Sequence, residues 1–109
     1  MFARLVTLKL KPNSAEEFSR LIDKEILPLL RKQKGFRDEV TFVSRERAKA
    51  VGISFWNTKE DALTYKDTGY PEVLNALVKV LSGKPTVETF EVANSTVHKL
   101  AAKAATKTA

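Results

Sequence analysis

Tyr65 and Tyr70 are the residues of this sequence whose side chains could take part most directly in chemistry on an organic molecule. A tyrosine hydroxyl can donate a hydrogen bond to an oxygen that becomes negatively charged. With an ordinary pKa of about 10, it is nevertheless a poor base near neutral pH. The two tyrosines therefore favour the holding of an oxyanion over the removal of a proton. The plain alternative is a pair of helix residues with hydrated hydroxyls.

Residue types and spacing exclude several other kinds of chemistry. The chain has no cysteine, which removes disulfides, thiolate catalysis and cysteine-based metal sites. Its single histidine, His98, stands in the C-terminal tail, and the carboxylates lack the spacing of a ligand set, so we expect no metal. We find no glycine-rich phosphate loop and no nucleophile elbow. His98 is expected to be hydrated or packed against the arm rather than to act as a base or haem ligand.

The net charge of +6 invites a nucleic-acid interpretation. Half of this excess lies in residues 94–109, which contain Lys99, Lys103 and Lys107 and no acidic residue. Neither this tail nor the basic turn at residues 45–49 has aromatic residues interleaved with its cations. We therefore interpret the charge as solvated surface and expect no nucleic-acid partner.

Hydrophobic spacing predicts the elements that must position these side chains. Alternating residues predict strands at 2–11, 36–44, 49–56 and 86–93. Apolar residues at helical spacing follow the capping residues Ser14 and Thr58. They predict one helix that ends at Gly35, and a second that runs to about Thr68, where Gly69 breaks it. Pro28 should kink the first helix or begin a separate last turn. A further helix, with Pro71 at its start, is predicted over 71–81.

This order, β-α-β-β-α-β, predicts an α+β ferredoxin-like fold in which helices cover one face of a four-stranded antiparallel sheet. The uncovered face, to which we assign Leu5, Val43 and Trp56, must meet water or a partner. We expect one domain over residues 1–93, followed by an arm and basic tail over residues 94–109. Residues 101–109 are expected to fray.

Three stretches of the chain carry a resemblance to a known family. They are residues 6–12 (Val-Thr-Leu-Lys-Leu-Lys-Pro) with the following Glu-Glu-Phe at 16–18, residues 26–30 (Ile-Leu-Pro-Leu-Leu) leading into Lys-Gly-Phe at 34–36, and residues 53–63 (Ile-Ser-Phe-Trp-Asn-Thr-Lys-Glu-Asp-Ala-Leu). Over about residues 2–93 the pattern resembles the antibiotic-biosynthesis-monooxygenase-like family of the dimeric α+β barrel superfamily. The resemblance implies a homodimer that packs sheet against sheet, with a small pocket between the sheet and helices of each subunit.

The resemblance also suggests which residues form that pocket. Trp56 falls at the family's strand–helix junction, and Tyr65 stands nine residues later, where many relatives carry a pocket-facing histidine. We therefore assign Tyr65 and Tyr70 as catalytic, and Trp56, Thr7 and Asn75 as substrate-binding. Packing at a strand end or at the dimer seam is the simpler account of Trp56.

Two other assignments concern haem degradation and the polar residues of the first strand. The haem-degrading branch uses an asparagine, a tryptophan and a haem-ligating histidine; the histidine position falls near Asn75 and the tryptophan position on Tyr65. Haem degradation is therefore not expected, and we expect no cofactor. Arg4 and Thr7 could reach a pocket or the dimer interface, although a structural role is the simpler account of both.

The resemblance implies a cofactor-independent oxygenase that acts on a small aromatic or quinol-type metabolite. Such chemistry requires an electron-rich phenolate, held by donors or a cation and kept from bulk water. Because the assigned residues include no good base, a non-catalytic homodimer that binds a small ligand or a regulatory partner stays open as the alternative. We expect a cytoplasmic protein, since no apolar run approaches the ~18 residues of a membrane span and residues 1–4 do not resemble a signal peptide.

Overall fold

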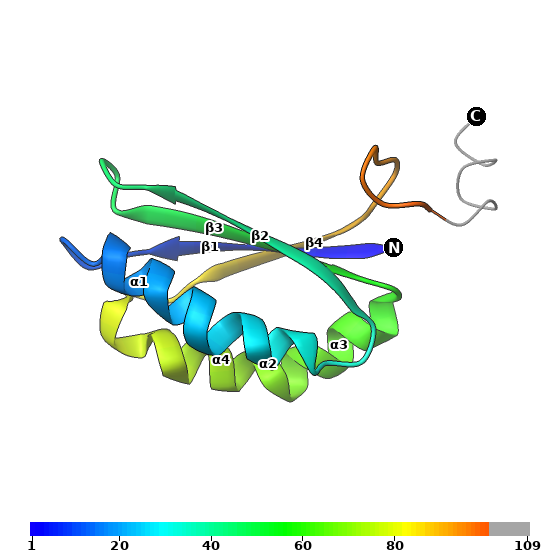
Figure 1. The fold of residues 1–109 in the computed structure, drawn as a ribbon, viewed down its shortest axis with the longest axis horizontal. Helices are drawn as coiled ribbons and strands as arrows, with labels where there is room; N and C mark the ends of the chain where they lie inside the picture. The colour runs from blue at the N-terminus through cyan, green and yellow to red at the C-terminus, as the bar shows by residue number, and fades with distance from the viewer. Residues whose placement is uncertain (101–109) are drawn as a thin grey trace.

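The computed structural model describes residues 1–100, and the fraying expected for residues 101–109 lies outside that range. The strands are β1 (Phe2–Lys9), β2 (Phe36–Ser44), β3 (Lys49–Trp56) and β4 (Thr86–Glu91). They form one antiparallel sheet in the order β2-β3-β1-β4, and the helices all lie on one side of it (Figure 1). The predicted α+β ferredoxin-like fold is confirmed.

The first helical stretch consists of three segments, α1 (Ala15–Leu21), the π-helical turn η1 (Ile22–Ile26) and α2 (Leu27–Arg31). Pro28 stands in the first turn of α2, so it begins a separate last turn, as the sequence predicts. Because Pro28 has no amide hydrogen to donate to the preceding turn, that turn can widen to π geometry without losing a bond. Ser14 makes no side-chain capping bond, so the predicted capping box is wrong.

The second helical stretch consists of α3 (Lys59–Asp67), α4 (Gly69–Leu77) and the 3-10 turn η2 (Val78–Val80). The predicted cap of α3 is confirmed, because Thr58 Oγ1 accepts a hydrogen bond of 3.1 Å from the amide of Asp61. Gly69 is not a break after α3 but the buried first residue of α4. A Cβ atom there would lie 2.8 Å from Cδ1 of Tyr65, so the glycine lets the tyrosine ring lie against the backbone of α4.

The side chains of β3 face the opposite way from the sequence-based assignment. Ser54 and Trp56 point toward the helices, and Trp56 is fully buried, with 0% of its surface exposed. Val43 also lies on the helix side, because it pairs with the buried Ala50. Only Leu5 lies on the uncovered face as expected, paired with Ile53. Two apolar sets alternate along β3, and alternation alone does not say which of them meets the helices.

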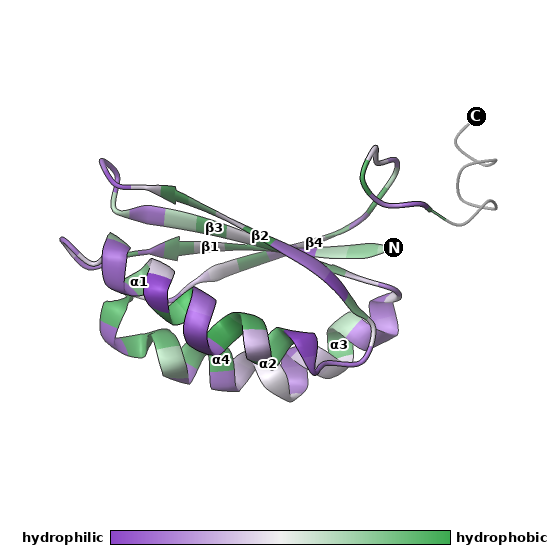
Figure 2. Ribbon diagram, in the orientation of Figure 1, coloured by the Kyte–Doolittle hydropathy of each residue, from purple (hydrophilic) through white to green (hydrophobic). Residues whose placement is uncertain are grey.

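The uncovered face of the sheet is consequently more apolar than the sequence suggested. Its apolar side chains are Ala3, Leu5, Val40, Phe42, Val51, Ile53, Phe55 and Phe90. Val40, Phe42 and Phe90 on the two edge strands are 40%, 55% and 50% exposed. The helices on the other side alternate hydrophobic and hydrophilic residues around their axes (Figure 2). Within residues 1–100, no helix has the length and apolar character needed to cross a membrane.

Candidate functional site

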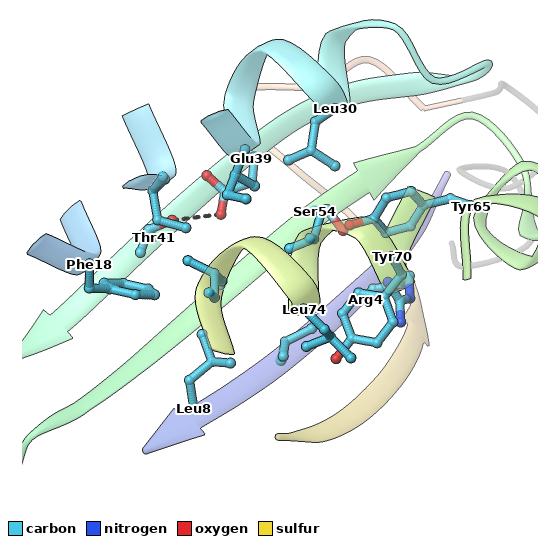
Figure 3. Close-up of a pocket in the computed structure, with 16 residues that line it drawn as sticks. Arg4, Leu8, Phe18, Leu30, Glu39, Thr41, Ser54, Tyr65, Tyr70 and Leu74 are labelled. Carbon is cyan, nitrogen blue, oxygen red and sulfur yellow. Dashed lines mark hydrogen bonds between the residues drawn. The ribbon is translucent and has the colours of Figure 1, made fainter. Parts of the chain in front are cut away.

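A cavity of about 60 Å³ lies between the helix-facing side of the sheet and the helices (Figure 3). Most of its wall is apolar and comes from α1, η1, α2 and α4, with Phe18 and Leu77 almost fully buried. The polar side chains on its wall are Arg4, Glu39, Thr41, Ser54, Tyr65 and Tyr70. The structure thus brings together the two predicted catalytic tyrosines, and it adds a cation and a carboxyl group to them.

Strand register places part of this polar set in one row across the sheet. Arg4 on β1 pairs with Ser54 on β3, and Ser54 pairs with Glu39 on β2. Since neighbouring strands lie about 4.8 Å apart, the backbones of Arg4 and Glu39 are separated by about 10 Å. Figure 3 shows Arg4 and Tyr70 toward one end of the cavity, Glu39 and Thr41 toward the other, and Ser54 between them. The cavity therefore has a cationic end and a carboxyl end.

Arg4 is a buried cation held against aromatic rings. Only 3% of the surface of Arg4 is exposed. Its guanidinium carbon lies 4.3 Å from the ring centre of Tyr70 and 5.1 Å from that of Tyr65. Arg4 takes part in none of the ion pairs formed among residues 1–100. Burial lowers the pKa of Arg4 from its ordinary value, and the two phenols partly oppose this change. An arginine nonetheless stays charged in a protein, so this end of the cavity carries a positive charge that a ligand can approach.

Tyr65 and Tyr70 are fixed donors rather than bases. Tyr65 is 4% exposed, and its ring centre lies 6.0 Å from that of Tyr70. Burial raises the pKa of both hydroxyls, while the charge of Arg4 opposes the change. Both tyrosines therefore stay protonated at neutral pH and can donate hydrogen bonds to a ligand oxygen, which is the chemistry that their residue type predicts.

Trp56 does not line the cavity but packs against residues that do. Its ring stacks on Tyr65 with 4.7 Å between ring centres, and it meets Phe36 edge to face at 5.6 Å. The indole Nε1 donates a hydrogen bond of 2.9 Å to Ser54 Oγ. Trp56 therefore positions two residues of the cavity wall, Tyr65 and Ser54. This is the packing role at a strand end that the sequence offered as the simpler account.

Glu39 is a candidate base that the sequence analysis missed. Thr41 Oγ1 donates a hydrogen bond of 2.6 Å to Glu39 Oε2. Burial raises the pKa of Glu39, the bond from Thr41 opposes the change, and the neighbouring Asp38 adds to it. A carboxyl group whose pKa moves toward neutrality is better matched to proton transfer. Gly52 leaves room for it, since a Cβ there would lie 3.3 Å from Glu39 Oε2.

The signal for Glu39 was present in the sequence but weak. Residues 37–39 read as an exposed charged run at the start of β2. The alternation of Glu39 and Thr41 with Val40 and Phe42 shows only that the polar pair shares one face. The register of β2 against β3 decides that this face meets the helices and not water.

Three other sequence-based assignments lie away from the cavity. Thr7 pairs with Val51 on the uncovered face, because it stands an odd number of residues from the inward-facing Arg4. Asn75 is exposed on α4 and does not line the cavity. His98 packs on the uncovered face, with its ring centre 5.3 Å from that of Phe55 and Nε2 3.4 Å from Asp38 Oδ2. Among residues 1–100, no three histidines or carboxylates gather as a metal site would require.

We predict that Glu39 makes the stability of the protein fall as pH rises. Since the folded-state pKa is raised above the ordinary value of 4.5, the folded chain keeps a proton that the unfolded chain has lost in the interval between the two values. The free energy of unfolding must therefore decrease as pH rises through that interval. Urea unfolding of Glu39→Gln between about pH 4 and pH 7 should show a variant that gains stability relative to the wild type toward higher pH. Parallel curves for the two proteins would contradict a raised pKa, and Glu88→Gln on the uncovered face is the matched control.

Comparison with known proteins supports the fold and leaves the function open. No family model and no curated protein matches the chain. Among solved structures, a protein of unknown function from Nitrosomonas europaea has a TM-score of 0.73 at 19% identity, covering 93% of this chain and 94% of its own. A monooxygenase of Streptomyces coelicolor, solved in complex with the ligand nanaomycin D, has a TM-score of 0.72 at 17% identity, covering 90% and 92%.

A third similar structure is a cofactor-independent oxygenase from Streptomyces nogalater, with a TM-score of 0.69 at 14% identity and coverage of 89% of this chain and 97% of its own. Identities this low show a shared fold and no more. Structures described as antibiotic biosynthesis monooxygenases, with TM-scores of 0.69 to 0.72, share the fold as well, so the fold resemblance that the sequence suggested is confirmed.

Proposed function

We propose that this protein is a cofactor-independent oxygenase of a small aromatic, quinol-type metabolite. The observation that carries the proposal is Arg4, a buried cation with no carboxylate partner within residues 1–100, set between two phenol rings in the wall of a mostly apolar cavity. A preorganised cation and neutral donors in a water-poor site stabilise negative charge as it forms on a bound molecule. The cofactor-independent oxygenase among the similar structures supports this reaction class.

The two ends of the cavity suit the two ends of such a substrate. The ring oxygen lies at Arg4, Tyr65 and Tyr70, and the opposite ring carbon, in its keto tautomer a CH₂ group, lies toward Glu39. Glu39 takes a proton from that carbon, and the electron pair moves through the ring to the oxygen, where Arg4 and the tyrosines hold the charge.

Molecular oxygen then supplies the oxidant. The electron-rich enolate transfers one electron to O₂, and the two radicals combine at the carbon to give a hydroperoxide that takes its proton back from Glu39. Loss of one water molecule leaves a carbonyl, so that CH₂ and O₂ become C=O and H₂O. Because O₂ accepts the electrons, the protein itself needs no redox group for this reaction. Its contribution is to form the anion, hold it and limit its contact with water.

The proposal is tested by oxygen uptake in the presence of naphthol- and quinol-type compounds. We expect substrate-dependent oxygen uptake that persists in the presence of a metal chelator. Arg4→Met should lower kcat/KM by about 10²–10³-fold, the effect usual for loss of one oxyanion-stabilising group. Arg4→Lys keeps the charge but not the planar stacking. Its kcat/KM should therefore lie between those of the wild type and Arg4→Met. Full activity in Arg4→Met would contradict the proposal.

A second candidate function is favoured by the size of the cavity. A volume of about 60 Å³ is well below the ~300–1,000 Å³ of most sites for small molecules. A non-catalytic protein that binds a small ligand, or serves a regulatory partner, would fit that size without any chemistry. Saturable binding with no oxygen uptake for any tested compound would favour this alternative.

We further propose that the uncovered face pairs with a second copy of the chain, and that residues 94–109 form an arm and basic tail separate from the domain of residues 1–93. The apolar side chains of that face and the contact of His98 with Phe55 support the pairing. Sedimentation should give a homodimer, which Phe42→Lys should weaken. A cytoplasmic location fits a chain without cysteine.

A further inference from the structure

A second hollow adjoins the cavity on the other side of Arg4 and Tyr70. It is an open groove of about 420 Å³ beside the edge strand β4, and Arg4 and Tyr70 line both it and the inner cavity. Its remaining wall consists of Phe2, Ala62, Leu63, Lys66, Val87 and Thr89. The stacked Arg4 and Tyr70 side chains therefore form the partition between the small inner cavity and the larger groove.

The groove combines an apolar wall with two cations. Leu63 and Val87 are 46% and 40% exposed, which leaves apolar surface that an aromatic ring can cover. Lys66 is exposed on α3 one turn after Ala62 and Leu63, and it lines the same groove. Neither Lys66 nor Arg4 takes part in the ion pairs formed among residues 1–100.

The carboxylates near the groove do not neutralise these cations by direct contact. In the register of the sheet, Glu91 pairs with Phe2 at one end of the groove but does not line it. Asp67 follows Lys66 directly in α3 and does not line it either. The groove is thus apolar with a positive side, the complement of a ring that bears an anionic substituent.

We propose that the groove is the outer half of a composite site and that the ligand is an aromatic carboxylate. One ring occupies the inner cavity past Tyr70, while the rest of the molecule lies in the groove with its carboxylate at Lys66 and Arg4. This inference deepens the proposed function, because the groove adds about 420 Å³ to an inner cavity of about 60 Å³ and so makes room for the part of the ligand that the cavity cannot hold. The Tyr70 ring must turn aside for the ligand to enter.

The test measures binding, so it does not depend on any turnover. Calorimetric titration would compare 1-hydroxy-2-naphthoate with 1-naphthol, two probes with the same ring system, one with and one without a carboxylate. We expect the wild-type protein to bind the carboxylate about tenfold more tightly, the usual scale of one charge-assisted hydrogen bond. This preference should shrink as salt is raised.

Variants of Lys66 test whether the groove itself supplies the preference for the carboxylate. Lys66→Met should abolish most of that preference while the affinity for 1-naphthol stays unchanged, and Lys66→Arg should retain the preference. Lys79→Met, which removes an exposed cation outside both hollows, is the matched control and should behave as wild type. Substitution of an exposed lysine leaves the core intact, so folding is not at issue.

The outcomes are distinguishable. Binding with the expected preference but without oxygen uptake would overturn the proposed oxygenase and leave the composite site standing. Equal affinity of the wild type for both probes, no binding of either one, or a preference that Lys66→Met does not change would overturn the inference about the groove.

Discussion

Glu39→Gln is expected to lower the kcat of oxygenation by about 10²–10⁴-fold, the usual contribution of a general base. Glutamine keeps the shape of the side chain and can still accept the hydrogen bond of Thr41, but it cannot take a proton. Oxygen uptake under saturating substrate measures the effect. KM should change little, because the carboxyl group acts on the reacting carbon and not on the charged end of the ligand.

The same variant offers a second readout that separates chemistry from folding. Because burial raises the pKa of Glu39, the variant should be at least as stable as the wild type at neutral pH while it loses activity. Glu88→Gln, on the uncovered face of the sheet, should keep both properties. Activity of Glu39→Gln within about twofold of wild type would remove Glu39 from the mechanism, whereas loss of activity together with loss of stability would point to a structural role.

Trp56→Ala is expected to destabilise the protein by about 3–5 kcal/mol, the usual cost of truncating a large buried aromatic side chain. Trp56 is 0% exposed, stacks on Tyr65, meets Phe36 edge to face, and donates its indole hydrogen to Ser54. Truncation leaves a void under Tyr65 and removes the donor to Ser54. Urea unfolding at a fixed protein concentration measures the change, since dimerisation would otherwise shift the apparent stability.

Trp56→Phe distinguishes packing from a role in ligand binding. Phenylalanine keeps the stack on Tyr65 and loses only part of the volume and the indole hydrogen bond, so the cost should be well below that of alanine. Binding of 1-naphthol to the phenylalanine variant should stay close to wild type, because Trp56 does not line the cavity. A large loss of affinity without a loss of stability would mean that Trp56 contacts the ligand directly.

The site illustrates how far residue types and spacing can lead. The family resemblance, together with residue type, predicts Tyr65 and Tyr70 as site residues, and the structure places both in the cavity wall beside Arg4. The sequence predicts of Arg4 only that it could reach a pocket or the dimer interface, and it does not single out Glu39. Both stand on strands, where neighbouring side chains point to opposite faces, and the sequence does not say which face is covered. Thr7 was misplaced for the same reason.

The sequence by itself determined the order of the elements and the fold class, because alternation, capping residues and turn residues such as Gly35 act over a few neighbouring positions. It also predicted that helices would cover a single face of the sheet. Only the tertiary structure decided which face of β3 meets the helices and that the row formed by Arg4, Ser54 and Glu39 closes one cavity. Those outcomes depend on the register between strands that are distant in the chain. Register is set by the packing of all the strands and helices together, and no local pattern encodes it.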